Sequence, residues 1–476
     1  MGPGGCNMIK FHVNKDPKAT HIYKQIYKNL KKFILEHKIA SGDKLPSKRR
    51  LADELHVSIN SVETAYEQLL AEGYIYSIQR KGYFVENIAQ FVKNTAHNDP
   101  LPHNMKEEFA QKDGWLSLSH IQTDCTMFPF HAWIKSEEMA ITHYKSELSE
   151  IPHPQGPYTT RKTIADMIAL SRGVICEPEQ IVIGTGIHSL LRQLMNTQST
   201  TSKIAMENPG YSRVYRILKD MDFDVIPTPL DKDGFNLHEA KQTDPTFLFV
   251  TPSHQLPTGT IMPISRRVDL LNWAAESDNR YIIEDDYDSE FKYETDNIPS
   301  LQGLDQNNRV IYFGTFSKTL LPSFRISYMV LPPDLLALFK NYYAEFIHGC
   351  SSLLLYTLHF FIKSGEYAKH IKRMNQQYEM KRQHLIKELH ATFQDKIHIH
   401  DIPAGLHFLA SFNSPRTYEE IAQQAKAEKL ELYTMKHFML DDMSIDSENI
   451  FLVIGFANIT FDEIPEVVER LRRIML

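Results

Sequence analysis

The sequence predicts two unlike domains, a small winged helix-turn-helix followed by a large α/β domain with a smaller α+β subdomain. A chain of 476 residues is too long for one ordinary hydrophobic core. The first 90 residues contain three helical patterns and a short hairpin, whereas later residues alternate short apolar runs with helical patterns. We therefore expect one domain over residues 8–87, a linker over 88–113 and a second domain over 114–476.

Charge is distributed unevenly between the two predicted domains. Residues 10–86 hold 14 Lys and Arg against 9 Asp and Glu, while the rest of the chain holds 38 basic and 50 acidic residues. A small basic module on an acidic body suits a polyanion partner. A solvated charged surface explains the same numbers equally well, so charge alone leaves both interpretations open.

Cysteine usage and hydropathy narrow the class of protein. The four cysteines lack metal-ligand spacing, which is typical of free thiols in a reducing compartment; they are Cys6, Cys125, Cys176 and Cys350. No run of about 18 apolar residues suggests a membrane span, and residues 1–6 lack the apolar core of a signal peptide. We expect a cytoplasmic protein with no metal site, whose natural start is Met8.

The first domain has three predicted helices and a hairpin. Apolar residues recur at helical spacing over residues 22–38. Ser47 is a good N-cap for a second helix, Ser58 can cap a third, and Gly73 is suited to the position just after it. Two short β-rich runs then flank a basic turn at residues 79–82. This order predicts a winged helix-turn-helix.

Several spaced motifs of this domain resemble the GntR-type winged helix. They are LPSKRRLA at 45–52, VS at 57–58, LLAEG at 69–73 and RKGYFV at 80–85. In that family the second helix of the pair enters the major groove, and the wing touches the minor groove or backbone. The resemblance implies phosphate contacts from Ser47 and Arg49. It also implies that residues between Ser58 and Thr64 face the bases, namely Ser58, Asn60, Ser61 and Thr64. Arg80 and Lys81 would form the tip of the wing.

The third helix departs from the family pattern at two positions. Ile59 stands where the family usually has arginine, and Glu63 stands where another basic residue is common. Ile59 could touch a thymine methyl group or merely pack against the core, and both interpretations remain open. Asn60 has the side chain that reads adenine. The departure puts the DNA target in doubt, and we still expect binding to double-stranded operator DNA.

The second domain reads as an α/β sheet followed by a smaller subdomain. Residues 181–183, 246–250, 280–283 and 309–313 are short, apolar and rich in β-formers, which is typical of buried parallel strands. Residues 365–476 mix helices with strands such as 451–455, and they predict a smaller α+β subdomain. Residues 88–113 lose this periodicity and read as the linker.

The strongest chemical signal is GTFSKTLLPSFRI at residues 314–326. A lysine after a strand and a small polar turn can form a Schiff base with an aldehyde, and here it is Lys318. Thr315, Ser317 and Arg325 are suited to holding a phosphate. A surface lysine before a helix is the competing interpretation of this stretch.

Three further motifs favour a pyridoxal-phosphate site. In IIEDDYDSEF at 282–291, Asp285 can pair with a pyridinium nitrogen and Tyr287 can reach the 3′ oxygen. The glycine-rich turn IGTGIH at 183–188 leads from a strand into a helix, where backbone N–H groups bind phosphate. Tyr211 in NPGYSR could stack on the ring.

The order of these motifs resembles the fold-type I aminotransferases over residues 115–476, and the fusion resembles the MocR group of regulators. Stretches shared with its GabR type, which regulates γ-aminobutyrate use, are HPQG, TPSHQ, PTG, RYIIEDDYDSE and GEYAKH. The resemblance implies a domain-swapped homodimer and an amine effector facing Arg213. It also implies a pyridoxal 5′-phosphate site made of Lys318, Asp285, Tyr287, Tyr211, Gly186, Ile187, Thr315, Ser317 and Arg325.

The chain departs from this pattern near its C-terminal end. Relatives carry arginine in a Gly-Phe-Ala-Arg motif that grips the substrate carboxylate, and here the residue is Asn458. Asparagine donates hydrogen bonds but carries no charge. We therefore expect a sensor in which Asn458 and Arg213 face the effector, and no enzyme. A PdxR-type sensor of pyridoxal phosphate and a working aminotransferase remain alternatives.

Overall fold

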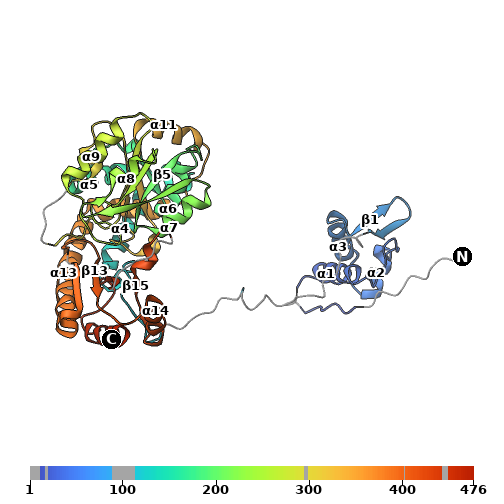
Figure 1. Cartoon of the computed structure of the whole chain (residues 1–476). Coiled ribbons are helices and arrows are strands. Elements are labelled where there is room, and N and C mark those ends of the chain that lie inside the picture. The colour runs from blue at the N-terminus through green and yellow to red at the C-terminus, as the bar shows by residue number, and fades with distance from the viewer. Residues whose placement is uncertain are drawn as a thin grey trace. The chain divides into compact units, whose positions relative to one another are not determined.

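The computed structural model describes residues 11–16, 20–87, 105, 113–293, 299–400, 402–441 and 449–476. The chain divides into two compact units, residues 1–111 and 112–476 (Figure 1). The expected start at Met8 lies outside the described residues. The predicted linker over residues 88–113 does so too, apart from residues 105 and 113. None of the described helices is both long and apolar enough to cross a membrane.

The first unit contains three helices and a two-stranded antiparallel hairpin. Their bounds are α1 Ile22–Leu35, α2 Lys48–Leu55, α3 Ile59–Ala71, β1 Ile75–Ile78 and β2 Gly82–Val85. The predicted caps are confirmed, because Ser47 Oγ accepts from Arg50 N and Ser58 Oγ accepts from Ser61 N, both at 3.2 Å. Gly73 follows α3 with a φ of +75°, as expected of a residue just past a helix.

The second unit is built on an eight-stranded sheet in the order β4-β11-β10-β9-β8-β5-β6-β7. The strands are β4 Ile181–Gly184, β5 Lys203–Asn208, β6 Asp224–Asp231, β7 Gly234–Phe235, β8 Phe247–Val250, β9 Tyr281–Asp286, β10 Val310–Thr315 and β11 Ser327–Val330. The five strands from β10 to β6 pair in parallel. β4 is buried and runs in the same direction as these strands, as predicted, but it does not pair with them, because β11 lies between β4 and β10 and pairs antiparallel with both.

Helices cover both faces of this sheet, because successive strand residues point to opposite sides. Ile311 and Phe313 of β10 pack with α6, α7 and α11, whereas Val310 and Tyr312 pack on the opposite side. The helices of this unit that precede the α+β subdomain are α4 Phe130–His143, α5 Tyr158–Arg172, α6 Ile187–Met195, α7 Ser212–Asp220, α8 Leu237–Lys241, α9 Ile264–Ala275, α10 Leu301–Leu304, α11 Pro333–Tyr342 and α12 Ser352–Lys363. The parallel strands therefore end together at one edge, where α/β proteins place their ligand sites.

The remainder of the second unit confirms the predicted α+β subdomain. Its elements are α13 Glu366–Phe393, β12 Ile397–His400, β13 His407–Phe412, α14 Tyr418–Ala427, β14 Leu430–Glu431, β15 Tyr433–Thr434, β16 Ile450–Gly455 and α15 Ile464–Met475. Four of its strands form a sheet in the order β12-β13-β16-β15. β3, at Leu116–Ser117, pairs in parallel with β14, and Leu118 enters the same core. The subdomain thus recruits residues from the start of the unit, which its own sequence did not indicate.

Candidate functional site

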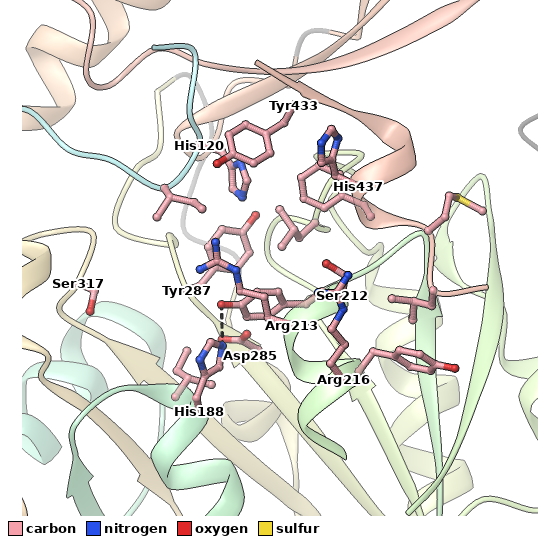
Figure 2. Close-up of a pocket in the computed structure, with 18 of the residues that line it drawn as sticks. His120, His188, Ser212, Arg213, Arg216, Asp285, Tyr287, Ser317, Tyr433 and His437 are labelled. Carbon is pink, nitrogen blue, oxygen red and sulfur yellow. Dashed lines mark hydrogen bonds between the residues drawn. The ribbon is translucent and has the colours of Figure 1, made fainter. Parts of the chain in front are cut away.

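A pocket of about 850 Å³ opens where β4, β5, β9 and β10 end. Figure 2 shows side chains from this edge facing His120, Tyr433 and His437, the last two from the α+β subdomain. The pocket brings together ten residues that the sequence analysis singled out: Gly186, Ile187, Tyr211, Arg213, Asp285, Tyr287, Thr315, Ser317, Lys318 and Arg325.

Lys318 follows β10 and directs its amine into the pocket region. Its Nζ donates to the carbonyl oxygen of His120 at 2.6 Å. Burial lowers the pKa of Lys318 to about 8. A lysine with this pKa offers a useful fraction of neutral amine near pH 7, which is the form that attacks an aldehyde.

Asp285 lies on β9 with a buried oxygen that has no partner among the described residues. Burial, reinforced by the charges of Asp286 and Asp288, raises its pKa to about 8. An unpaired buried acid costs free energy unless a cationic or N–H group meets it. Its position on the pocket wall fits a protonated ring nitrogen, which would restore the ionised carboxylate.

The turn into α6 forms a cradle for an anion. Gly186 has a φ of +105°, and a Cβ atom there would lie 2.2 Å from Nη2 of Arg325. Glycine is therefore required for the guanidinium to lie against the turn. The first amides bonded back to Gly186 O are those of Ser189 and Leu190, so the amide of Ile187 makes no such intrahelical bond. Free first-turn amides beside an arginine suit a phosphate.

The turn after β10 gives its two hydroxyl residues different positions. Thr315 Oγ1 accepts hydrogen bonds from Ser317 N at 3.1 Å and from Ser327 Oγ at 2.7 Å, so it shapes the turn. Both Thr315 and Ser317 line the pocket. Their predicted role in binding a phosphate stays a prediction, and their position on the pocket wall is compatible with it.

Two tyrosines border the space above Asp285. The hydroxyl of Tyr211 lies 3.1 Å from Nε2 of His188, a contact dashed in Figure 2. The hydroxyl of Tyr287 lies 3.2 Å from Nδ1 of His254. Both tyrosines therefore have fixed positions before any ligand binds, and their roles beside a pyridine ring stay predictions.

The two residues predicted to face an effector lie in different surroundings. Arg213 lines the pocket, and its charge contributes to lowering the pKa values of Lys318 and His120. Asn458 is not among the lining residues, and its Nδ2 donates to Oε1 of Gln122 at 2.7 Å. The effector role of Asn458 stays a prediction, and the amide that was to replace the arginine is already engaged.

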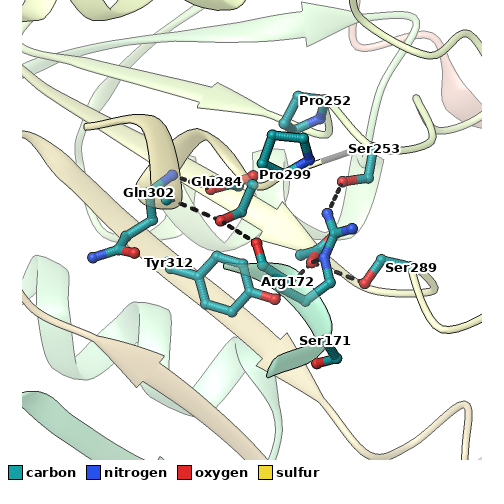
Figure 3. Close-up of polar contacts among 12 residues, drawn as sticks. Ser171, Arg172, Pro252, Ser253, Glu284, Ser289, Pro299, Gln302 and Tyr312 are labelled. Carbon is teal, nitrogen blue, oxygen red and sulfur yellow. Dashed lines mark hydrogen bonds and ion pairs between the residues drawn. The ribbon is translucent and has the colours of Figure 1, made fainter. Parts of the chain in front are cut away.

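The sequence analysis missed a buried polar layer behind the pocket. Arg172 donates to Asp286 at 2.7 Å, and Tyr312 donates to the same carboxylate at 2.6 Å (Figure 3). The guanidinium lowers the pKa of Asp286 although burial opposes it. This network holds the end of β9, on which Asp285 stands.

Other missed residues come from segments far apart in the chain. His120, Tyr433, His437 and Arg216 line the pocket, while His254, Asp288 and His407 cluster in the interior. His254 and Asp288 lie inside the TPSHQ and DDYDSEF stretches, so their motifs carried a signal. No local pattern pointed to the remaining five.

The second candidate site is the exposed face of α3 in the first unit. Ile59 is 41% exposed, so the interpretation that it packs into the core is wrong. Asn60 and Thr64 are also exposed, whereas Ser61 is half-buried with its Oγ 2.8 Å from Ser58 Oγ. Ile59, Asn60 and Thr64 can therefore meet a partner, and Ser61 reinforces the cap.

Charged side chains frame this face. Arg49 on α2 is exposed, as are Arg80 and Lys81 at the tip of the hairpin. Glu63 pairs with Lys48 of α2 at 2.5 Å, so its negative charge is partly balanced within the unit. The predicted DNA contacts stay predictions, and they lie on an accessible surface.

Comparison with known proteins identifies both units. Residues 115–471 match the class I and II aminotransferase family, and residues 22–85 match the gntR family of bacterial regulatory proteins. The HTH-type transcriptional regulator YdeL of Bacillus subtilis is 38% identical over 95% of this chain and 96% of its own length. The probable rhizopine catabolism regulatory protein MocR of Rhizobium meliloti is 32% identical over 82% of each chain.

Two further likenesses bear on the second unit. The pyridoxine biosynthesis regulator PdxR of Corynebacterium glutamicum is 29% identical over 76% of this chain and 78% of its own. Pyrococcus horikoshii kynurenine aminotransferase superposes with a TM-score of 0.68 at 20% identity, over 76% of this chain and 91% of its own, which shows the fold. The chain belongs to the MocR group, in which a gntR-family DNA-binding domain is joined to a class I and II aminotransferase domain.

Proposed function

We propose that this chain is a cytoplasmic transcriptional regulator that binds pyridoxal phosphate at Lys318 and operator DNA through its winged helix. The observation that carries the proposal is one pocket with three complementary parts. These are the amine of Lys318, the unpartnered oxygen of Asp285 and the anion cradle of Gly186 and Arg325. Bound pyridoxal phosphate supplies an aldehyde and an electron-withdrawing ring.

Each part of the pocket is suited to bind one chemical group of pyridoxal phosphate. Lys318 presents an amine of which a useful fraction is neutral near pH 7, since burial lowers its pKa to about 8. Asp285 accepts the ring N–H, and Arg325 with the amides after Gly186 balances phosphate charge. Tyr211 borders the ring. These roles are the ones the resemblance implies, and the geometry supports them.

The test is absorption of the full-length protein after incubation with pyridoxal phosphate. We expect a visible band that Lys318→Ala abolishes without loss of helical signal. Lys292→Ala is the matched control, because burial lowers the pKa of Lys292 to about 8 as well and Lys292 does not line the pocket. A colourless wild type, or a band that survives Lys318→Ala, would contradict the proposal.

The DNA side of the proposal rests on the exposed face of α3 and the basic hairpin tip. A homodimer, domain-swapped as the resemblance implies, would present two such faces to a two-part operator. Full-length protein should bind double-stranded operator with a strong dependence on salt concentration, because basic side chains release counterions from DNA. Binding that is insensitive to salt would contradict phosphate contacts by Arg49, Arg80 and Lys81.

The effector is either an amine or the cofactor itself, and Asn458 favours the cofactor. Asn458 does not line the pocket, and its uncharged amide is engaged with Gln122, so it offers no charge that would hold a carboxylate. The similarity to PdxR supports the same alternative. In this case DNA binding responds to pyridoxal phosphate without any added amine.

A titration of the visible band separates the two effectors. γ-Aminobutyrate, alanine and other amines should change the wild-type band weakly, and Asn458→Arg should tighten amino-acid binding by up to about tenfold, or about 1.4 kcal/mol. Tight conversion of the wild-type band by γ-aminobutyrate would refute cofactor sensing and restore the GabR-type interpretation.

We further propose that the aminotransferase-like unit senses its ligand and does not turn it over. The reason is again the missing arginine at position 458, since transamination needs a firmly oriented carboxylate. Steady turnover of an amino acid with a 2-oxoacid by the loaded full-length chain would overturn this part of the proposal.

A further inference from the structure

A polar triad of Tyr287, His254 and Asp288 lies beside the pocket, and Tyr287 is the member that lines it. Tyr287 lines the pocket, and its hydroxyl lies 3.2 Å from Nδ1 of His254. The same Nδ1 lies 2.9 Å from Oδ2 of Asp288. His254 and Asp288 are only 2% and 1% exposed, so water does not compete for these contacts.

The chemistry of the two partners of His254 indicates where the protons lie. A carboxylate accepts hydrogen bonds only, so Nδ1 of His254 carries the proton that bridges to Asp288. The same N–H can reach the Tyr287 oxygen only as a donor, which leaves the tyrosine oxygen an acceptor there. The hydroxyl proton of Tyr287 is therefore free to point elsewhere, and the open direction is the pocket.

The backbone around the triad leaves it little freedom to rearrange. Gly405 has a φ of +71°, and a Cβ atom on it would lie 2.2 Å from Nδ1 of His254 and 2.6 Å from Oδ2 of Asp288. Glycine at this position lets the chain close directly over the hydrogen bond. The backbone at Gly405 therefore fixes the orientation of the His254 imidazole ring.

We propose that His254 and Asp288 are positioning residues that keep the Tyr287 hydroxyl oriented as a donor toward the 3′ oxygen of bound pyridoxal phosphate. This inference rests on the proposed function. It assigns a task to two interior residues that do not line the pocket and that the functional description above leaves unused.

The surroundings of the triad favour a protonated tyrosine. Burial raises the pKa of Tyr287 well above its usual value, and the neighbouring carboxylates add to that effect. The titratable groups facing Tyr287 and His254 from the packed elements are Glu207, Asp285, Asp286, Asp288, Lys318 and His407. Tyr287 is thus protonated at neutral pH and can donate its hydroxyl proton.

The orientation has a measurable consequence for the bound cofactor. The 3′ oxygen is more negative after the cofactor–lysine linkage loses its proton, so a donor at that oxygen favours the deprotonated form. The pH midpoint of the visible band is therefore lowered by Tyr287. Loss of the donor should raise the midpoint by about one pH unit, the scale of one net hydrogen bond.

The experiment is a spectroscopic pH titration of the loaded full-length protein and four variants. Tyr287→Phe should raise the midpoint by about one unit and gives the full effect. His254→Asn keeps an amide near the place of Nδ1 and should stay near wild type. His254→Gln moves the amide toward Nε2 and frees Tyr287 to donate to Asp288, so its midpoint should rise toward that of Tyr287→Phe.

The fourth variant decides whether His254 acts through Tyr287. In the double variant Tyr287→Phe with His254→Gln, the midpoint should equal that of Tyr287→Phe alone. Phenylalanine has no hydroxyl proton for His254 to orient, so the second substitution has nothing further to change. A merely structural role for His254 would add its own shift. Additive shifts, or an unchanged midpoint in His254→Gln, would overturn the proposal.

A second measurement determines which nitrogen of His254 carries the proton in the wild type. Nitrogen-15 NMR of histidine-labelled wild type should show His254 with its proton on Nδ1, with the signal identified by its loss in His254→Asn. A proton on Nε2 would overturn the inference. A protein that forms no visible band would instead refute the proposed function, so the two failures are distinguishable.

A bound cation is the main competing use of the cluster. His254, Asp288 and His407 each offer a ligand atom within 4.8 Å of the others, and Nε2 of both histidines lacks a partner among the described residues. Zinc or a chelator should leave the wild-type midpoint unchanged if the triad directs a proton. A midpoint that follows added zinc would overturn the assignment.

Discussion

The two candidate sites of the chain differ in how exposed their ion pairs are. In the first unit the ion pair of Lys48 and Glu63 reaches solvent, with side chains 26% and 42% exposed. In the second unit the side chains of Arg172 and Asp286 are 5% and 0% exposed. Accessible charge suits a surface that meets a polyanion, whereas dehydrated charge suits a site that must bind a small charged ligand strongly.

The exposure of an ion pair determines how much stability is lost when one partner is removed. A surface ion pair contributes up to about 1 kcal/mol and can be exchanged freely. A buried pair becomes a liability when one partner is removed, because the other charge stays without water or a counter-ion. Substitutions at an exposed pair and at a buried pair should therefore differ in how much stability they remove, as well as in the property they change.

The largest effect is expected from Arg172→Ala. It leaves Asp286 buried without its guanidinium, which should lower the free energy of unfolding of the second unit by about 3–5 kcal/mol. Tryptophan fluorescence in a denaturant titration reports this unit alone, because Trp115, Trp133 and Trp273 are the three tryptophans of the chain.

The matched control is Lys363→Ala. Lys363 pairs with Asp166, and both side chains are about half exposed, so the loss should stay under about 1 kcal/mol. Equal destabilisation by the two substitutions would remove the distinction between buried and exposed charge.

The next effect concerns the recognition face of the first unit. Asn60→Ala should relax sequence preference at one operator position, at a cost of about 1–3 kcal/mol, because an amide can read a base edge. Arg49→Ala should instead weaken binding to all sequences uniformly. Competition binding with operators changed one base pair at a time distinguishes them, and identical sequence-independent losses would refute the assignment of α3.

The success of sequence reasoning also differed between regions. Ser47, Ser58 and Gly73 were predicted because helix caps depend on a few adjacent residues. Lys318, Asp285 and Tyr287 were predicted because each follows an apolar strand within a short motif. Their convergence on one pocket follows from the parallel sheet, whose strands end at the same edge.

What the sequence did not indicate depends on contacts between distant segments. β11 was missed, and its insertion beside β4 could not be inferred from the apolar run of β4 itself. His120 and Tyr433 reach the pocket from opposite ends of the second unit, with ring centroids 5.0 Å apart. No periodicity within either segment encodes such a pairing.

A third effect is a pH dependence confined to the second unit. Burial raises the pKa values of Glu207 and Glu284 to about 7, and those of Asp285 and Glu290 to about 8. Between about pH 4 and these values each of the four carboxyls binds more protons in the folded state than in the unfolded chain, so its contribution to stability falls as pH rises. Each such carboxyl contributes up to about 1.4 kcal/mol per pH unit.

Denaturant titrations followed by tryptophan fluorescence at pH 5.5 and pH 7.5 measure this slope. Buried histidines with lowered pKa values, such as His120 and His370, act in the opposite sense, so the comparison is made against Asp285→Asn, which keeps them. Relative to Asp285→Asn, cofactor-free wild type should lose stability at the higher pH, and pyridoxal phosphate should reduce the difference, because the ring N–H pairs with ionised Asp285. Asp286 acts in the opposite sense, since its lowered pKa adds stability that is lost only at acid pH. A wild type that gains stability over this interval relative to Asp285→Asn would contradict the raised pKa of Asp285.

The smallest effect is expected from Glu63→Gln on α3. Glu63 is the acidic side chain on the recognition helix that pairs with Lys48, and the pair is partly exposed. Loss of the carboxylate removes a repulsion toward DNA phosphates and releases Lys48 to meet them, so operator affinity should rise by less than about 1 kcal/mol. The salt dependence should steepen by up to about one released counterion. Lys48→Gln is the matched control and should weaken binding while it flattens the salt dependence. If Glu63→Gln weakened binding instead, Glu63 would be reading a base, because a carboxylate can accept from cytosine N4, and the sequence preference at one position would then change together with the affinity.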